Sequence, residues 1–251
     1  MSKPVCKPVW RQDFTRADAD LRDWNIRLGN DLLDEAGRPI VPGWGNNERQ
    51  YYTADAANLY LDGTGLNLCA RRQPVEEGGR RFAYTSARLD TKDRMAFRYG
   101  KLVVRARLPE GAGLWPAIWL MPQADKYGPW PASGEIDLLE ARGRLPREIS
   151  GTLHYGPDMA RKRIDEFAHR LEQGTIAQDR EYGLEWTEEA IRWLVDGYCY
   201  AERRLEPGMP FDEPFYLVLN LAVGGWYDDV PVDDAALPAV MTVAEIVRFD
   251  L

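Results

Sequence analysis

The sequence has few cysteines, a deficit of basic residues and no long apolar run. Its three cysteines, Cys6, Cys69 and Cys199, are odd in number and far apart, so neither a disulfide framework nor a zinc motif can be assigned. We expect buried free thiols, with one bridge as the alternative. Lysine and arginine number 32 against 40 acidic residues, and the net charge of -8 disfavours nucleic acid or an anionic membrane as a partner. The chain lacks a stretch of about 18 apolar residues, so no membrane span is expected.

The composition favours a fold made of many short strands. The chain of 251 residues contains 22 glycines and 17 prolines, which suit frequent turns better than long helices. Hydrophobic residues make up 45% of the chain, enough for a large core. Because all-β sandwiches often reach this length as one unit, we expect a single domain over residues 1–251. We also expect the protein to be a monomer.

The segment Gly134–Glu140 contains three carboxylates separated by large aliphatic residues. Glu135 and Asp137 alternate with apolar residues at a period of two, which predicts a strand with one acidic face. Glu140 lies three residues after Asp137, so a β-bulge is needed to return it to that face. Clustered carboxylates repel one another, which makes them a candidate site. The structural alternative is a solvent-facing strand with alternating acids.

Tryptophans accompany the acidic segment along the chain. Trp115 and Trp119 precede it in a run of apolar residues, and Trp130 lies just before it. The apolar C–H faces of sugar rings stack on indole, so tryptophans beside carboxylates favour carbohydrate over a hard metal ion. Taken singly, each tryptophan is more often a core residue.

Seven stretches that span most of the chain share one pattern. They are GWGNNE (43–48), QYYT (50–53), YTSARL (84–89), WPAIWL (115–120), GEIDLLE (134–140), GTLHYG (151–156) and NLAVGG (220–225). In this order they resemble glycoside hydrolase family 16, in the laminarinase-like branch with the bulged Glu-x-Asp-x-x-Glu signature. The resemblance implies an all-β fold, a β-sandwich (jelly roll) of two antiparallel sheets with a concave substrate cleft. It also implies an endo-acting retaining hydrolase of β-1,3-glucan, with a polysaccharide as partner and no required cofactor.

The resemblance implies a role for each carboxylate. Glu135 would attack the anomeric carbon and form a covalent glycosyl-enzyme. Glu140 would donate a proton to the leaving oxygen and then accept one from water. Asp137 would hydrogen-bond Glu135 and help to separate the acidities of the two glutamates.

Six further residues are candidates for substrate binding. They are Trp115, Trp119, Trp130, Asn46, Arg88 and His154. Taken alone, Asn46 belongs to a surface loop, Arg88 to a strand surface, and His154 is more often a structural hydrogen-bonding group than a catalyst. The resemblance implies that Asn46 lines the glycone side of the cleft and that His154 lies beside the glutamates.

A structural calcium ion and the compartment are also addressed by the resemblance. Several relatives bind calcium through an acidic residue of the closing strand, where this chain has Glu245, so calcium near Glu245 is an open expectation. Enzymes of this kind usually meet their polymer outside the cell, which implies a secreted or periplasmic protein. The segment Met1–Cys6 has no apolar leader, which would instead indicate the cytoplasm if the chain is complete.

The segment 157–180 and the residue Asn220 differ from the pattern around them. Residues 157–180 are charged where relatives carry a polar, aromatic loop, and we expect a solvated surface loop. A short helix, or a rim that alters which polymer fits, are the alternatives for this segment. Asn220 interrupts an apolar strand, and we expect its amide to bond to the backbone, because buried amides need partners.

Other functions remain open on the sequence. An enzyme of the same family acting on a mixed-linkage glucan or a galactan is one, and a transglycosylase is another, since water and a sugar hydroxyl compete for one intermediate. A non-catalytic β-glucan-binding protein is a rival from another class, although such proteins typically lose the glutamates. The last alternative treats the three acids as a metal site.

Overall fold

The computed structural model describes residues 7–34 and 37–251, which form strands joined by turns and short 3-10 helices. The segment Met1–Cys6, with its cysteine and the expected absence of a leader, lies outside the described residues. Cys69 is a buried free thiol as expected, whereas Cys199 is free but exposed. Within the described ranges no helix is long and apolar enough to cross a membrane.

Ten strands form the first sheet, sheet A. Its main order is β18 (Tyr198–Arg204), β17 (Ala190–Val195), β16 (Arg180–Trp186), β11 (Gly100–Arg107), β20 (Ala239–Phe249), β7 (Leu66–Glu77), β8 (Arg80–Ser86) and β5 (Gln50–Tyr52). Two more strands attach beside this path, β1 (Pro8–Asp13) on β20 and β6 (Leu59–Leu61) on β7.

Eight strands form the second sheet, sheet B. Its main order is β15 (Arg163–Arg170), β14 (Glu148–Tyr155), β13 (Glu135–Glu140), β12 (Leu114–Pro122), β19 (Phe215–Val223), β9 (Arg88–Asp90) and β2 (Asn25–Arg27), with β10 (Ala96–Phe97) paired to β19. A small third sheet pairs β3 (Asp31–Leu33) with β4 (Pro39–Pro42). The 3-10 helices are η1 (Gly43–Gly45), η2 (Met159–Arg161), η3 (Trp226–Asp228) and η4 (Asp234–Ala236).

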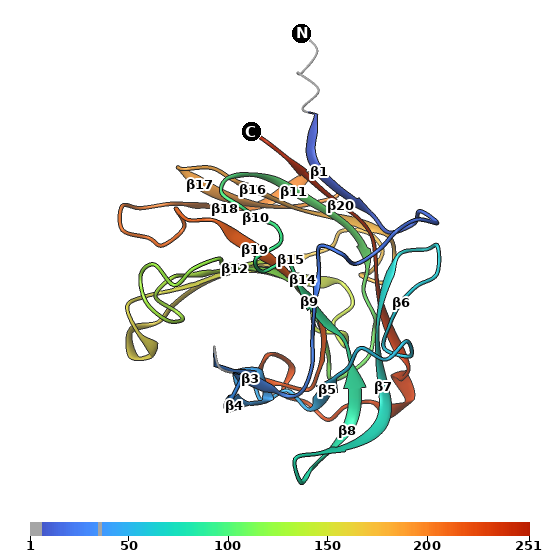
Figure 1. Cartoon of the computed structure of the whole chain (residues 1–251). Coiled ribbons are helices and arrows are strands. Elements are labelled where there is room, and N and C mark those ends of the chain that lie inside the picture. Colours follow the sequence, from blue (N-terminus) through green and yellow to red (C-terminus); the bar gives the residue numbers. More distant parts are fainter. Residues whose placement is uncertain (1–6, 35–36) are drawn as a thin grey trace.

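The two large sheets stack face to face, as expected for a sandwich. Figure 1 shows β11, β16, β17 and β18 lying over β12, β14, β15 and β19, with β3 and β4 on the opposite side of sheet B. Alternate residues of β11, among them Leu102 and Val104, are fully buried and join Ile118 and Leu120 of β12 in one apolar core. Burial of this apolar area is the main force that holds the layers together.

The sequence-based fold class is confirmed, with one local difference in pairing. Both large sheets are built from antiparallel pairs, except that β5 pairs with β8 in parallel. The described residues contain no α-helix. The alternation of buried and half-exposed residues along β12 defines an outer face of sheet B, turned away from sheet A, on which Trp115 and Trp119 lie.

The expectation for residues 157–180 was wrong in its central part. The segment begins with η2 and continues as β15, an eight-residue strand that pairs with β14 along its whole length and ends sheet B. Phe167 is half-buried and packs on Trp193 at a ring distance of 5.0 Å, which anchors the strand to the core. Only the following turn, up to β16, resembles the solvated loop that was expected.

Candidate active site

A bulge in β13 brings the three carboxylates to one face of sheet B. On β12, Ile118 pairs with Leu139 and the next residue, Trp119, pairs with Asp137, so Leu138 has no partner in this register. Both Leu138 and Leu139 are buried in the core. The extra residue shifts the alternation of side chains by one position, so that Glu140 points to the same face as Glu135 and Asp137. The predicted bulge is therefore confirmed.

The register with β14 gives each carboxylate a polar neighbour. Glu135 lies opposite His154, Asp137 opposite Thr152, and Glu140 opposite Ser150. Directly paired residues point to the same side of a sheet, with Cβ atoms about 5 Å apart. The outer face of sheet B thus carries three adjacent polar pairs.

Glu135 accepts a hydrogen bond from a tryptophan, and a histidine lies beside the neighbouring Asp137. The indole Nε1 of Trp130 donates a 2.6 Å hydrogen bond to Oε2 of Glu135. Nε2 of His154 lies 3.2 Å from Oδ2 of Asp137, and the imidazole and Trp130 rings are 6.1 Å apart. Trp130 and His154, both predicted as site residues, are brought to the carboxylates.

Glu140 is held by a different pair of donors. Trp115 donates from its indole Nε1 to Oε1 of Glu140 at 3.0 Å, and the hydroxyl of Thr152 donates to Oε2 at 3.3 Å. Glu140 is only 8% exposed. Its side chain is therefore fixed by two donors that do not contact Glu135.

Burial raises the pKa of all three carboxyl groups. Desolvation, followed by the charge of Asp137, raises the pKa of Glu135 to about 8. Desolvation and the same Asp137 charge raise the pKa of Glu140 well above its ordinary value, against a lowering effect of His154. The pKa of Asp137 is raised as well, first by desolvation. Because the groups interact, the protons belong to the cluster, which holds fewer than three negative charges at neutral pH.

Tyr227 of η3 supports Glu140 and was not predicted from the sequence. Its ring stacks on Trp115 at 5.2 Å, and its hydroxyl forms a 2.7 Å hydrogen bond with Ser150. The guanidinium carbon of Arg142 lies 4.1 Å from the centroid of the same Tyr227 ring, and Nε of Arg142 donates to the Tyr227 carbonyl oxygen at 2.7 Å. No local motif marks this tyrosine, since it reaches the site from a loop remote in sequence.

Arg88 lies between two tryptophans on β9. Its guanidinium carbon is 4.2 Å from the ring centroid of Trp44 and 4.8 Å from that of Trp119. Arg88 is only 8% exposed, and its Nε has no hydrogen-bond partner among the described residues. Asn220 is buried nearby and accepts a 2.7 Å hydrogen bond from Nε1 of Trp119, so the expected backbone partner for its amide was wrong.

Asn46 is fixed by a buried glutamate that sequence reasoning did not single out. Glu48 is 6% exposed and accepts from Nδ2 of Asn46 at 3.1 Å, from Gln50 at 2.6 Å and from the Tyr52 hydroxyl at 2.9 Å. The backbone N–H of Trp226, a residue that is 68% exposed, donates to the carbonyl oxygen of Asn46 at 2.9 Å. The loop from Gly43 to Glu48 is thus rigidly attached beside an exposed indole.

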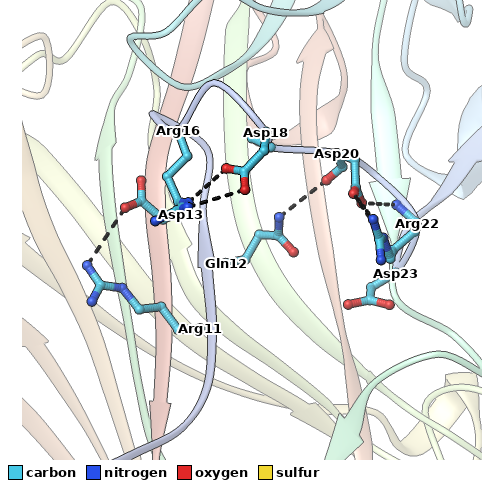
Figure 2. A pocket seen from close by; sticks show the side chains of 9 residues that line it. Arg11, Gln12, Asp13, Arg16, Asp18, Asp20, Arg22 and Asp23 are labelled. Atoms are coloured by element: carbon cyan, nitrogen blue, oxygen red, sulfur yellow. Dashed lines mark hydrogen bonds and ion pairs between the residues drawn. The ribbon is translucent and has the colours of Figure 1, made fainter.

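Glu245, near which calcium was an open expectation, has a basic partner, and the calcium ion stays a prediction. Its carboxylate is hydrogen-bonded and ion-paired with Arg11, which supplies the positive charge that a cation would provide. Arg11 also lines a surface depression of about 420 Å³ built by the N-terminal segment (Figure 2). There the acids pair with neighbouring arginines, as Asp18 does with Arg16 at 2.8 Å. The depression is lined by three arginines and four aspartates and contains no residue of the carboxylate cluster.

The carboxylate cluster itself has donors that could hold a metal ion. One ligand atom each from Glu135, Asp137 and His154 lie within 4.8 Å of one another. Carboxylate and imidazole ligands suit several divalent metals. The metal alternative raised by the sequence therefore has a specific location.

Comparison with known proteins identifies relatives over nearly the whole chain. Residues 44–240 match the model of the glycosyl hydrolases family 16. The chain is 38% identical over 94% of its length to "Glucan endo-1,3-beta-glucosidase A1" from Niallia circulans, of which it spans only 36%, about a third. It is also 38% identical to "Beta-glucanase" from Rhodothermus marinus, covering 96% of this chain and 84% of the relative. The laminarinase catalytic domain from Thermotoga maritima MSB8 superposes with a TM-score of 0.85, at 33% identity and 98% coverage of both chains.

Proposed function

Because this chain belongs to the glycosyl hydrolases of family 16, we propose that it is an endo-acting retaining hydrolase that cleaves β-1,3-glucan through a covalent glycosyl-enzyme. Relatives named as endo-1,3-β-glucosidase, β-glucanase and laminarinase support this substrate class. The observation that carries the proposal is the β13 bulge, which puts Glu135 and Glu140 on one face. A retaining mechanism needs two such carboxyl groups on either side of one glycosidic bond.

Burial raises the pKa of both glutamates, and we assign them different roles by the donors that hold them. Glu135 is the nucleophile, and the indole N–H of Trp130 stabilises its ionised form. Glu140 is the general acid, and its raised pKa keeps it protonated until the leaving oxygen departs. In the second step Glu140 accepts the proton of the attacking water, and the β-configuration of the sugar is retained.

Asp137 shares a proton with Glu135 and Glu140. Like charges at close range cannot all be ionised, so a proton held on Asp137 leaves Glu135 free to attack. Asp137 is 3% exposed, and its charge raises the pKa of both glutamates. We assign it a positioning and proton-sharing role.

The positions of the side chains support the substrate-binding roles that we assign. Trp115 and Trp119 lie on the outer face of β12 and offer indole rings to the sugar units at the reacting bond. Arg88 and Asn46 bind units on the glycone side through N–H donors. Binding energy gained at these remote units lowers the barrier at the reacting bond.

Reducing-sugar release from laminarin tests the proposal. The wild-type protein should release reducing ends and yield oligosaccharides of intermediate length, as an endo-acting enzyme does. Glu135→Gln should lose at least about a thousandfold in kcat while still binding laminarin, and Glu181→Gln, at an exposed position of β16, serves as the matched control. Binding without release in both wild type and Glu135→Gln would leave a glucan-binding protein.

The remaining alternatives are separated by the same assay. A panel with mixed-linkage glucan and a galactan ranks the polymers, and product sizing at high acceptor concentration reveals transglycosylation. The proximity of Glu135, Asp137 and His154 favours a metal-dependent activity as the second candidate. Activity abolished by a chelator and restored by a divalent metal would support that candidate.

A further inference from the structure

The edge strand β15 extends the polar rows of the active site by one strand. In the register with β14, Ile164 pairs with His154, Glu166 with Thr152, and Ala168 with Ser150. The same β14 residues pair with Glu135, Asp137 and Glu140. These three residues of β15 therefore share the outer face of sheet B with the catalytic carboxylates. Since neighbouring strands are about 4.8 Å apart, they lie roughly 10 Å from β13.

Glu166 occupies the middle row and has a free carboxylate. It is exposed, and within residues 7–34 and 37–251 no hydrogen bond or ion pair is formed by its side chain. Two cations at the ends of this strand have other partners: Lys162 lies 4.7 Å from the centroid of the Trp130 ring, and Arg170 lies 3.9 Å from Glu148. The acceptor oxygens of Glu166 are therefore available to a ligand.

The position of β15 in sheet B decides on which side of the cleaved bond Glu166 lies. Sheet B runs from β15 through β13 to β9, so Glu166 and Arg88 lie on opposite sides of the catalytic strand. The proposed function puts Arg88 and Asn46 on the glycone side. A residue on the far side of Glu140 then faces the leaving-group, or aglycone, side.

We propose that Glu166 binds the hydroxyl groups of an uncharged sugar unit on the aglycone side, and thereby selects neutral β-glucan over polymers that carry sulfate or carboxylate groups there. This inference rests on the proposed function. An ionised carboxylate is an acceptor only, and sugar hydroxyls donate to it. A sulfate or carboxylate on the sugar has no proton to donate and is repelled by the like charge.

The neighbours of Glu166 on β15 suit this role. Ile164 is 51% exposed and offers an apolar surface to a sugar ring, while Ala168 leaves space beside Ser150. Neither residue supplies a positive charge that would attract an anionic unit. The strand thus presents a hydroxyl acceptor whose two immediate neighbours on this face are uncharged, with Arg170 following Ala168 at the next position of the same face.

Steady-state kinetics of Glu166→Gln on three substrates test the proposal. The substrates are neutral laminarin, a carboxymethylated β-1,3-glucan, and a nitrophenyl β-glycoside of laminaribiose, which fills the glycone side and has no sugar as leaving group. For laminarin, kcat/KM should fall about fivefold to tenfold, because the neutral amide oxygen of Gln accepts from a sugar hydroxyl more weakly than the ionised carboxylate does. The ratio of carboxymethylated to neutral polymer activity should rise about tenfold, and the nitrophenyl substrate should change far less than laminarin, because the charge of Glu166 is only the smallest of the causes that act on the pKa of Asp137. The control Glu181→Gln should match the wild type on all three.

Each other outcome has a separate meaning. Equal kinetics of Glu166→Gln and wild type on every substrate would overturn the inference and leave the proposed function intact. An equal loss on laminarin and on the nitrophenyl substrate would also overturn it, because Glu166 would then act on the chemistry rather than on the aglycone unit. A wild-type protein inactive on both neutral substrates would instead refute the proposed function.

Discussion

Nε2 of His154, the β14 residue that pairs with Glu135, lies 3.2 Å from Oδ2 of Asp137, the carboxylate between the two glutamates on β13. The pKa values of Glu135 and Glu140 are raised chiefly by desolvation and next by the charge of Asp137, and the proximity of His154 lowers both. The histidine therefore opposes the effect of the aspartate. This balance sets the pH range in which one glutamate is ionised and the other is protonated.

Replacing His154 should move the pH dependence of the reaction. In His154→Gln the lowering effect is lost, so the pKa of both glutamates rises and both limbs of the kcat/KM profile shift to higher pH, by about 0.5–1 unit. A pH series of initial rates on laminarin measures the shift. A profile that stays in place or moves to lower pH would contradict the electrostatic role.

Asp137→Asn should stabilise the protein at alkaline pH. The pKa of Asp137 is raised in the folded state, so the folded chain holds more protons than the unfolded chain between about pH 4 and pH 8. The wild type therefore loses stability as pH rises through this range, and the amide does not. We expect a gain of about 1–3 kcal/mol in the free energy of unfolding at pH 8, with little gain at pH 4.

Urea denaturation at the two pH values measures this difference, with Glu181→Gln as the control at an exposed carboxyl. The same Asp137→Asn protein should have low activity, since its proton-sharing group is gone. A variant that is less stable than the wild type at pH 8 would show that the ionised carboxylate of Asp137 stabilises the folded protein, which contradicts this prediction.

Trp115→Phe should alter the general acid without removing the aromatic stack. The phenyl ring can still pack on Tyr227, but the 3.0 Å hydrogen bond to Glu140 is lost. That hydrogen bond lowers the pKa of Glu140, so its loss should raise this pKa and move the alkaline limb of the pH profile to higher pH. We also expect kcat to fall about tenfold. Trp119→Phe is the matched control, because the Trp119 indole donates to Asn220 and its loss should leave the alkaline limb in place. Equal shifts in the two variants would refute the assignment.

The central part of the site was predictable because the constraint is local. The alternation of acids with Ile136 and Leu138 predicts a half-buried strand, and the three-residue gap from Asp137 to Glu140 predicts the bulge that the register contains. Trp130 lies five residues from Glu135, to which it donates, so this contact is also short-range. Trp115 is 25 residues from Glu140 and meets it through the pairing of β12 with β13.

Contacts that depend on distant segments were not predictable in the same way. Tyr227 reaches Trp115 and Ser150 from a loop that follows another strand, and no spacing rule connects them. The strand β15 was mistaken for a loop or short helix, because its charged residues hide a weak alternation in which Phe167 faces the core. The position of a strand at a sheet edge, which gives Glu166 its neighbours, is decided by tertiary packing.

Azide rescue of glutamate variants tests the division of roles most directly. With an activated β-glycoside as substrate, Glu135→Gly should be inactive until azide enters the space of the missing carboxylate and attacks the anomeric carbon, giving the α-glycosyl azide. Glu140→Gly should still form the glycosyl-enzyme on Glu135, and azide should then release the β-glycosyl azide. Analysis of the product anomers by NMR distinguishes the two. The account predicts α from the first variant and β from the second; the reverse assignment, or the same anomer from both folded variants, would contradict it.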